Sequence, residues 1–214
     1  MDIQQVVIDL FEGFGMTVAI FFATLAVALP LGLLFAFLQK CKFKPIKYLM
    51  DAFIWIIRGT PLMLQIIVVY YVPGLLDWGF SIREEFIAVL IAFSINYACY
   101  FSVIFKGGMD AVPKGQYEAC QVLGMTKSQA FIKVAWPQIY KNILPPMSNE
   151  IITLVKDTSL ARIIGLAELI FAGQDFLNKG YLAPFFATAL FYLAFVGILS
   201  ILFANLEKRT NRYR

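Results

Sequence analysis

Long apolar stretches separated by short polar segments dominate this chain. A helix needs roughly 20 mostly apolar residues to cross a bilayer, and five stretches approach that length: residues 14–38, 49–72, 86–105, 137–155 and 182–206. The first, third and fifth contain no charged residue, which is rare in water-soluble helices of this length. The second contains Asp51 and Arg58, and the fourth contains Lys141, Glu150 and a proline pair. The pattern predicts an all-α membrane protein of about five transmembrane helices, forming a single transmembrane domain over residues 1–214.

Two further apolar segments are too short or too polar to cross. Residues 160–172 are interrupted by Arg162, Gly165 and Glu168, so we expect an external or re-entrant helix there and not a sixth span. Residues 3–12 alternate apolar and polar positions at helical spacing. This segment is interpreted either as a helix lying in the outer interface or as a frayed extension of the first span.

Composition and charge agree with a membrane protein and predict its orientation. The chain is 60% hydrophobic, whereas soluble domains are nearer half. The residues before the first span carry three acids and no Lys or Arg, so the first apolar run is not a secretory signal and should be retained. On one side of the five predicted spans lie thirteen basic residues: Lys40, Lys42, Lys44, Lys47, Lys106, Lys114, Lys127, Lys133, Lys141, Lys208, Arg209, Arg212 and Arg214. The other side has only Arg83, Arg162 and Lys179. Since Lys and Arg concentrate in cytoplasmic segments, we expect the amino terminus outside and the carboxyl terminus in the cytoplasm.

The longest predicted cytoplasmic connection covers residues 106–136 and has its own helical pattern. Residues 116–123 favour a helix, Gly124 interrupts it, and residues 128–134 can resume a helix before Pro137. A helix-glycine-helix elbow of this size has little core and must dock on something to be well ordered. From physical pattern alone, an amphipathic surface hairpin remains an equal alternative.

The elbow carries residues that resemble the EAA loop of permease subunits in binding-protein-dependent ABC importers. The matching residues are Glu118, Ala119, Cys120, Gly124, Val134, Trp136 and Pro137. Residues 58–62, 107–116, 149–150 and 156–160 further resemble the polar amino-acid branch, so that the likeness covers nearly the whole chain. One departure is Ser102, which stands where many relatives carry a glutamate.

The resemblance implies a type I ABC importer (MetI-like) permease fold in the cell inner membrane. It also implies that the elbow is the coupling helix, which contacts a cytoplasmic ABC ATPase dimer through Gln116, Tyr117, Glu118, Ala119, Cys120 and Gly124. The chain has no Gly-x4-Gly-Lys-Ser/Thr phosphate loop. ATP and Mg would therefore be bound by the ATPase, with no cofactor in this chain. A second permease subunit, identical or paralogous, and an extracytoplasmic solute-binding protein are the other expected partners, beside membrane lipid; nucleic acid is not expected.

Acidic residues in the fourth span are the first candidates for substrate contact. Glu150 and Asp157 are seven residues apart, so on one helix they share a face, with Thr153 and Thr158 nearby. Ionisable groups within spans mark substrate paths by default. The stripe would attract an ammonium or guanidinium; alternatively, Lys156 or Arg58 neutralises it as a structural ion pair. The prediction is a basic amino acid such as arginine, lysine or histidine, with glutamine or another polar amino acid as the alternative.

Three further residues complete the predicted substrate site. Asn96 and Tyr97 lie midway along the third span and could bond a substrate or a neighbouring helix, the latter being the commoner outcome. Arg58 could bind a substrate carboxylate or pair with Asp51, and their seven-residue spacing favours the pair. Pro61 should kink the second span.

Other classes fit the sequence less well. The chain contains no histidine, which removes His-based acid-base chemistry, zinc-histidine sites and a Ser-His pair. The three cysteines show no paired spacing, so neither a disulfide framework nor a metal site is expected. A proton-coupled secondary transporter would explain intramembrane carboxylates, but it does not need the cytoplasmic elbow. A transport subunit without enzymatic activity of its own is the prediction.

Overall fold

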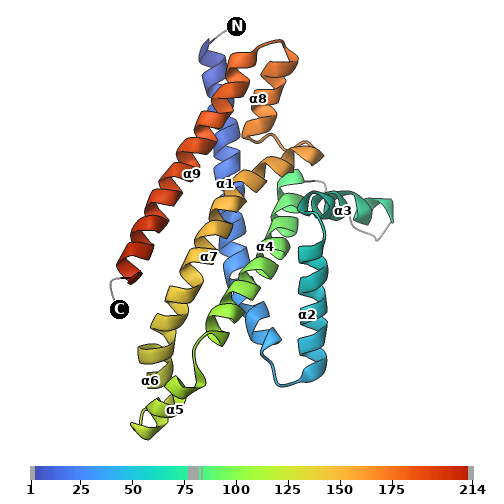
Figure 1. The fold of residues 1–214 in the computed structure, drawn as a ribbon. Helices are drawn as coiled ribbons and strands as arrows, with labels where there is room; N and C mark the ends of the chain where they lie inside the picture. The colour runs from blue at the N-terminus through green and yellow to red at the C-terminus, as the bar shows by residue number, and fades with distance from the viewer. Residues whose placement is uncertain (1–2, 77–81, 83, 212–214) are drawn as a thin grey trace.

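The computed structural model describes residues 3–76, 82 and 84–211, and within these residues the regular elements are all helices (Figure 1). Three of the basic residues used to predict the membrane orientation, Arg83, Arg212 and Arg214, lie outside the described residues. In chain order the elements are α1 (Ile3–Gln39), α2 (Lys44–Gly59), α3 (Leu62–Leu75), α4 (Glu85–Asp110), α5 (Lys114–Val122), α6 (Lys127–Ala130), the π-helix η1 (Phe131–Ala135), α7 (Trp136–Asp157), the 3-10 helix η2 (Thr158–Ile164), α8 (Leu169–Asn178) and α9 (Leu182–Asn211).

The centre of the bundle is the long contact between α1 and α4. Along α1 a small residue recurs at every fourth position, namely Thr24, Ala28, Gly32 and Ala36, and all four are buried. A β-carbon on Gly32 would lie 2.8 Å from the Phe101 Cβ and 2.9 Å from the Ala98 carbonyl oxygen of α4. In lipid, small residues permit this close approach because helices there associate by packing and not by hydrophobic exclusion.

The second predicted span is broken rather than kinked. α2 and α3 meet at Gly59, Thr60 and Pro61 and are bent by 103°, so that α3 runs crosswise to the other helices (Figure 1). Pro61 is extended at φ −63° and ψ 134° and begins α3 as its N-cap. The bend is larger than the expected kink because Thr60 and Pro61 both leave the helical conformation.

The amino-terminal segment does not form an interfacial helix, contrary to the first of its two interpretations. Residues 3–12 continue α1 without interruption, and Val6 and Leu10 are buried in a small core with Leu169 and Phe176 of α8. Part of the segment's apolar face packs against α8, which lies beside the start of α1 (Figure 1), whereas Ile3, Val7 and Phe11 are exposed.

The short apolar segment over residues 160–172 is two helices and not one. η2 ends at Gly165, which adopts φ 89°, and α8 begins only at Leu169. A left-handed residue ends a helix, and glycine adopts it without steric cost. The segment folds at the end of the bundle opposite the elbow, beside the start of α1 and α9 (Figure 1).

By length and composition three described helices could cross a membrane: α1, α4 and α9 over Leu182–Thr210. The bent pair of α2 and α3 would make a fourth. α7 is 22 residues long but carries Lys141, Glu150, Lys156 and Asp157, so its composition alone does not identify it as a span. Five membrane crossings therefore stay a prediction. It requires the polar residues of α7 to face an aqueous path and not the lipid.

Two α1 glycines provide a test of the central contact. Gly32→Ala should lower the melting temperature of the purified chain in detergent, because the added methyl overlaps the α4 backbone and overpacking costs about 1–3 kcal/mol. Gly15→Ala is the matched control, since nothing lies within 4 Å of its β-carbon position and alanine favours a helix by about 1 kcal/mol over glycine. Equal melting temperatures for the two variants would contradict the close α1–α4 packing.

Candidate functional site

The acidic stripe of α7 faces the aromatic side of α4. The Tyr97 hydroxyl donates a 2.7 Å hydrogen bond to the Asp157 carboxylate, and Tyr97 is almost completely buried. Glu150 and Asp157 are each only partly buried in the single chain. The structure therefore brings together three of the predicted site residues, at the carboxyl-terminal half of α7 and the middle of α4.

Arg58 completes this group from a third helix, and it does not pair with Asp51 as the spacing favoured. Its guanidinium carbon lies 4.9 Å from the centre of the Tyr100 ring of α4. Asp51 instead accepts a 2.8 Å hydrogen bond from Gln39. Two side chains on the same helix face pair only when no other group lies closer. Here Tyr100 of α4 contacts Arg58, and Gln39 of α1 contacts Asp51.

The alternative ion pairs for the stripe do not form. Among the described residues, neither Glu150 nor Asp157 has a Lys or Arg nitrogen within 4.0 Å. Asp157 has a neutral hydroxyl as its partner. A carboxylate that is half-buried and not ion-paired retains its attraction for a cation.

Asn96 bonds a neighbouring helix, whereas the partly exposed Thr153 bonds only its own helix backbone. Asn96 is buried and donates to the Gln65 side-chain oxygen at 3.1 Å, and the Thr153 hydroxyl donates to the Asn149 carbonyl at 2.9 Å. Gln65 in turn donates to the Ile57 carbonyl at 2.8 Å and to the Thr60 hydroxyl at 2.9 Å. Gln65 thus closes the break between α2 and α3 and attaches it to α4. Sequence reasoning missed Gln65, although a glutamine four residues after a mid-span proline is a usable signal.

The elbow has the predicted helix-glycine-helix form. α5 ends at Val122, Gly124 turns the chain at φ 67°, and α6 begins after Thr126. Thr126 and Gln129 form a reciprocal capping box, in which the Thr126 hydroxyl accepts from the Gln129 amide. The elbow projects from one end of the bundle, below α4 and α7 (Figure 1).

Apolar side chains lie exposed at the tip of this elbow. Val122 is 88% and Leu123 is 76% exposed, while Cys120 is buried against the rest of the chain. The side chains of Tyr117 and Glu118 are exposed. An exposed apolar tip on a polar loop is typical of a contact surface. Val122 and Leu123 were not among the predicted coupling residues; their apolar character next to Gly124 could have indicated them.

A buried carboxylate connects the helices at the end of the bundle opposite the elbow. Glu168 is fully buried and caps α8 by accepting 2.8 Å hydrogen bonds from the Ile170 and Phe171 amides. The Tyr192 hydroxyl of α9 donates to it at 3.2 Å, and the Thr17 hydroxyl of α1 accepts from the Leu169 amide. These bonds join α1, α8 and α9. The sequence pattern treated Glu168 only as an interruption, yet a Glu before an apolar helix start also fits an N-cap.

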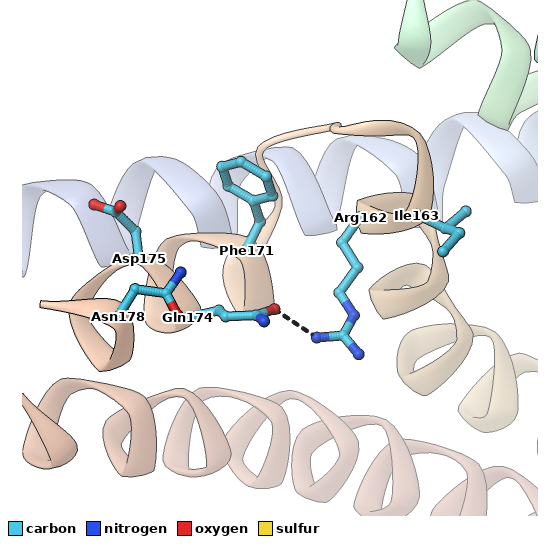
Figure 2. A pocket seen from close by; sticks show the side chains of 6 residues that line it. All are labelled: Arg162, Ile163, Phe171, Gln174, Asp175 and Asn178. Carbon is cyan, nitrogen blue, oxygen red and sulfur yellow. Dashed lines mark hydrogen bonds between the residues drawn. The ribbon is translucent and has the colours of Figure 1, made fainter. Parts of the chain in front are cut away.

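A cavity of about 380 Å³ lies beside α8 at this end (Figure 2). It is lined by Arg162, Ile163, Phe171, Gln174, Asp175 and Asn178. Arg162 donates a 2.7 Å hydrogen bond to Gln174, as the dashed line in Figure 2 marks. A hydrogen bond to Asp175 raises the pKa of the Lys179 ammonium, so these two charges largely neutralise each other.

The long apolar helices, the crosswise broken helix and the projecting elbow define a helical membrane protein, and comparison with known proteins identifies it as a permease of a known family. Residues 28–212 match the family described as "Binding-protein-dependent transport system inner membrane component". The chain belongs to this family.

Individual relatives agree with this assignment. The chain is 34% identical to the arginine transport system permease protein ArtQ of Bacillus subtilis over 92% of this chain and 90% of that protein. It is also 34% identical to the L-cystine transport system permease protein TcyB of Bacillus subtilis, over 86% of this chain and 78% of that protein. The solved structure titled "Crystal structure of an amino acid ABC transporter with histidines" has a TM-score of 0.86 and 32% identity, covering 97% of this chain and 96% of that chain. The expected all-α importer permease fold is confirmed.

Replacing Glu168 tests the stability of the end of the bundle that contains α8. Glu168→Ala removes the acceptor for two backbone amides and one hydroxyl, and leaving a buried donor unpaired costs about 1–3 kcal/mol. The melting temperature in detergent should fall clearly. Glu12→Ala on exposed α1 surface is the control and should change it little. A Glu168→Ala variant as stable as Glu12→Ala would show that the buried bonds do not hold α8.

Proposed function

We propose that this chain is the transmembrane subunit of an ATP-driven importer that carries polar amino acids, with basic L-amino acids as the first candidates. The observation that carries the proposal is the unpaired acidic stripe, Glu150 and Asp157, beside Tyr97 and Arg58. The arginine permease relative supports a cationic substrate. The cystine permease relative favours a second candidate, an uncharged or zwitterionic polar amino acid.

The stripe suits the α-ammonium or guanidinium of a basic amino acid. Two carboxylates on one face of α7 attract positive charge, and the Tyr100 ring, which already has the Arg58 guanidinium carbon 4.9 Å from its centre, favours a cation. Tyr97 is almost completely buried and acts on the stripe through its hydroxyl, which donates to Asp157. Arg58 stands near the stripe and could bind the substrate carboxylate. Asn96 acts indirectly in this proposal, by holding Gln65 and the α2–α3 break in place.

Exposed Arg58 also argues for assembly of two permease subunits. Its side chain is exposed in the single chain, and a charged side chain facing hydrocarbon is costly. A second copy or close paralogue facing this side would enclose the polar residues around a shared aqueous path. Two-fold dimers are the commonest symmetric assembly, and the family name implies delivery of substrate by a separate binding protein.

The elbow would receive force from a cytoplasmic ATPase that supplies the ATP and Mg site. Gln116, Tyr117, Glu118, Ala119 and Gly124 would form the contact, with Val122 and Leu123 added from the structure, whereas Cys120 is buried and would support the elbow from inside. In this proposal the elbow end lies in the cytoplasm and the amino terminus lies outside. The excess of Lys and Arg at the elbow end supports that orientation.

Neutralising the stripe tests the substrate site. Glu150→Gln and Asp157→Asn, made in the assembled permease-ATPase complex, should each reduce uptake of radiolabelled L-arginine into proteoliposomes by at least tenfold. The reason is that losing an opposite charge in a poorly solvated site costs more than about 1.4 kcal/mol. Basal ATP hydrolysis should be retained.

The control is Asp175→Asn, which changes an equally acidic residue on α8 away from the stripe. Its uptake should match that of the unchanged protein. Normal L-arginine uptake by both stripe variants would contradict the basic-substrate proposal, provided that uptake of a neutral amino acid is also the same in the variants and the unchanged protein.

Changes at the elbow test the coupling proposal. Glu118→Lys and Gly124→Asp should release the ATPase from the permease, by charge reversal at an exposed contact and by strain at a residue with φ 67°. Co-purification of the ATPase with the tagged chain measures the effect. Membrane insertion should persist in both variants.

Gly180→Asp is the matched control, because Gly180 also has a positive φ, of 85°, but lies between α8 and α9 at the other end of the bundle. It bears a comparable backbone strain without touching the elbow and should keep the ATPase bound. Undiminished co-purification in both elbow variants would remove the elbow as the docking site.

A further inference from the structure

The elbow end of the bundle contains a second cavity, between the first turns of α7 and the last turns of α9. Its volume is about 520 Å³, within the range of ligand-binding pockets. α7 and α9 contact each other in the bundle. The lining residues are Pro137, Gln138, Tyr140, Lys141, Leu206, Arg209 and Thr210.

Two cations, Lys141 and Arg209, enter this cavity from opposite helices without an acidic partner. Among the described residues neither has a carboxylate oxygen within 4.0 Å. Glu207 is the nearest acid along α9 and makes no ion pair with either. Most of the remaining lining is apolar, from Pro137, Leu206 and the Tyr140 ring. Unpaired cations over apolar walls favour a ligand that is anionic at one end and apolar at the other.

The position of the cavity identifies the kind of ligand. Lys141 lies in the second turn of α7 and Arg209 in the last turn of α9, both near helix ends, and only 6% of the apolar stretch of α9 is buried within the chain. α9 therefore presents a continuous surface to lipid chains directly next to the cavity. Basic pockets between membrane helices bind the head groups of anionic lipids.

We propose that this cavity is a binding site for an anionic phospholipid. Lys141 and Arg209 bind the phosphate from two sides, the Tyr140 and Thr210 region accommodates the polar head, and an acyl chain lies along α9 over Leu206. The bound lipid joins the free end of α9 to α7. The site is separate from the acidic stripe, and its existence does not depend on which amino acid is carried.

Native mass spectrometry of the purified full chain in detergent tests the proposal. Phosphatidylglycerol and phosphatidylcholine with the same acyl chains are titrated separately. The unchanged chain should retain phosphatidylglycerol more tightly. Lys141→Gln and Arg209→Gln should each weaken its retention about fivefold, which is the contribution of one basic residue near an anionic head group. The double variant should show little preference between the two lipids.

Lys208→Gln is the matched control, because it removes a neighbouring positive charge of α9 that does not line the cavity. It should leave the preference for phosphatidylglycerol intact. If Lys208→Gln weakens lipid retention as much as Arg209→Gln, the retention depends on the total positive charge of this end of α9, and the specific site is refuted. If Lys141→Gln folds poorly, Arg209→Glu is used in its place. An unchanged preference of Arg209→Glu for phosphatidylglycerol would also refute the site.

Two further measurements distinguish a phospholipid from other possible ligands of the cavity. Inorganic phosphate at millimolar concentration should not displace the lipid; displacement would identify a simple anion site and contradict the proposal. Assembly with the ATPase should leave the lipid bound. Its loss on assembly would show that the cavity is a protein contact surface instead.

Discussion

Inside a bilayer no water is present to satisfy a polar group, so every polar atom must find a partner within the protein or open onto an aqueous path. This constraint explains the unusual features of the fold. The broken helix frees backbone carbonyls at Ile57 and Thr60, and Gln65 donates to both. Glu168 carries a carboxylate into the core, and two amides and a hydroxyl meet it. The stripe on α7 is an exception, because among the described residues Glu150 has no hydrogen bond or ion pair and Asp157 has only the Tyr97 hydroxyl. That exception is where a substrate path is expected.

The two ends of the bundle are built differently, and the difference matches the two roles proposed for them. At the elbow end, Asp110 accepts from Lys40 and lies 3.4 Å from Lys106, which ties the start of the loop to the α1–α2 turn while the tip stays exposed. At the other end, Glu168 and Thr17 hold α8 firmly against α1 and α9. α4 and α7 connect the two ends and pack against each other. Alternating access would then be a change in how two such subunits rock against each other.

Much of the fold followed from sequence because apolar length and glycine position are local properties. The helical character of the long stretches and the turn at Gly124 needed only residue type and spacing. The acidic stripe followed from a seven-residue interval on one helix. Partner choice was harder: Arg58 and Asp51 share a face, yet Tyr100 and Gln39 contact them instead. The role of residues 3–12 also depended on α8, which lies more than 150 residues away in sequence. Such long-range packing is invisible to local periodicity.

The central claim is that movement of substrate through this chain is driven by nucleotide hydrolysis in a separate subunit acting at the elbow. The most direct measurement is uptake of radiolabelled L-arginine by proteoliposomes containing this permease and a binding protein, with and without the ATPase. With the ATPase present, uptake should require ATP and stop when ATP is depleted while a proton gradient is maintained. Uptake that follows the proton gradient in the absence of the ATPase would contradict the claim.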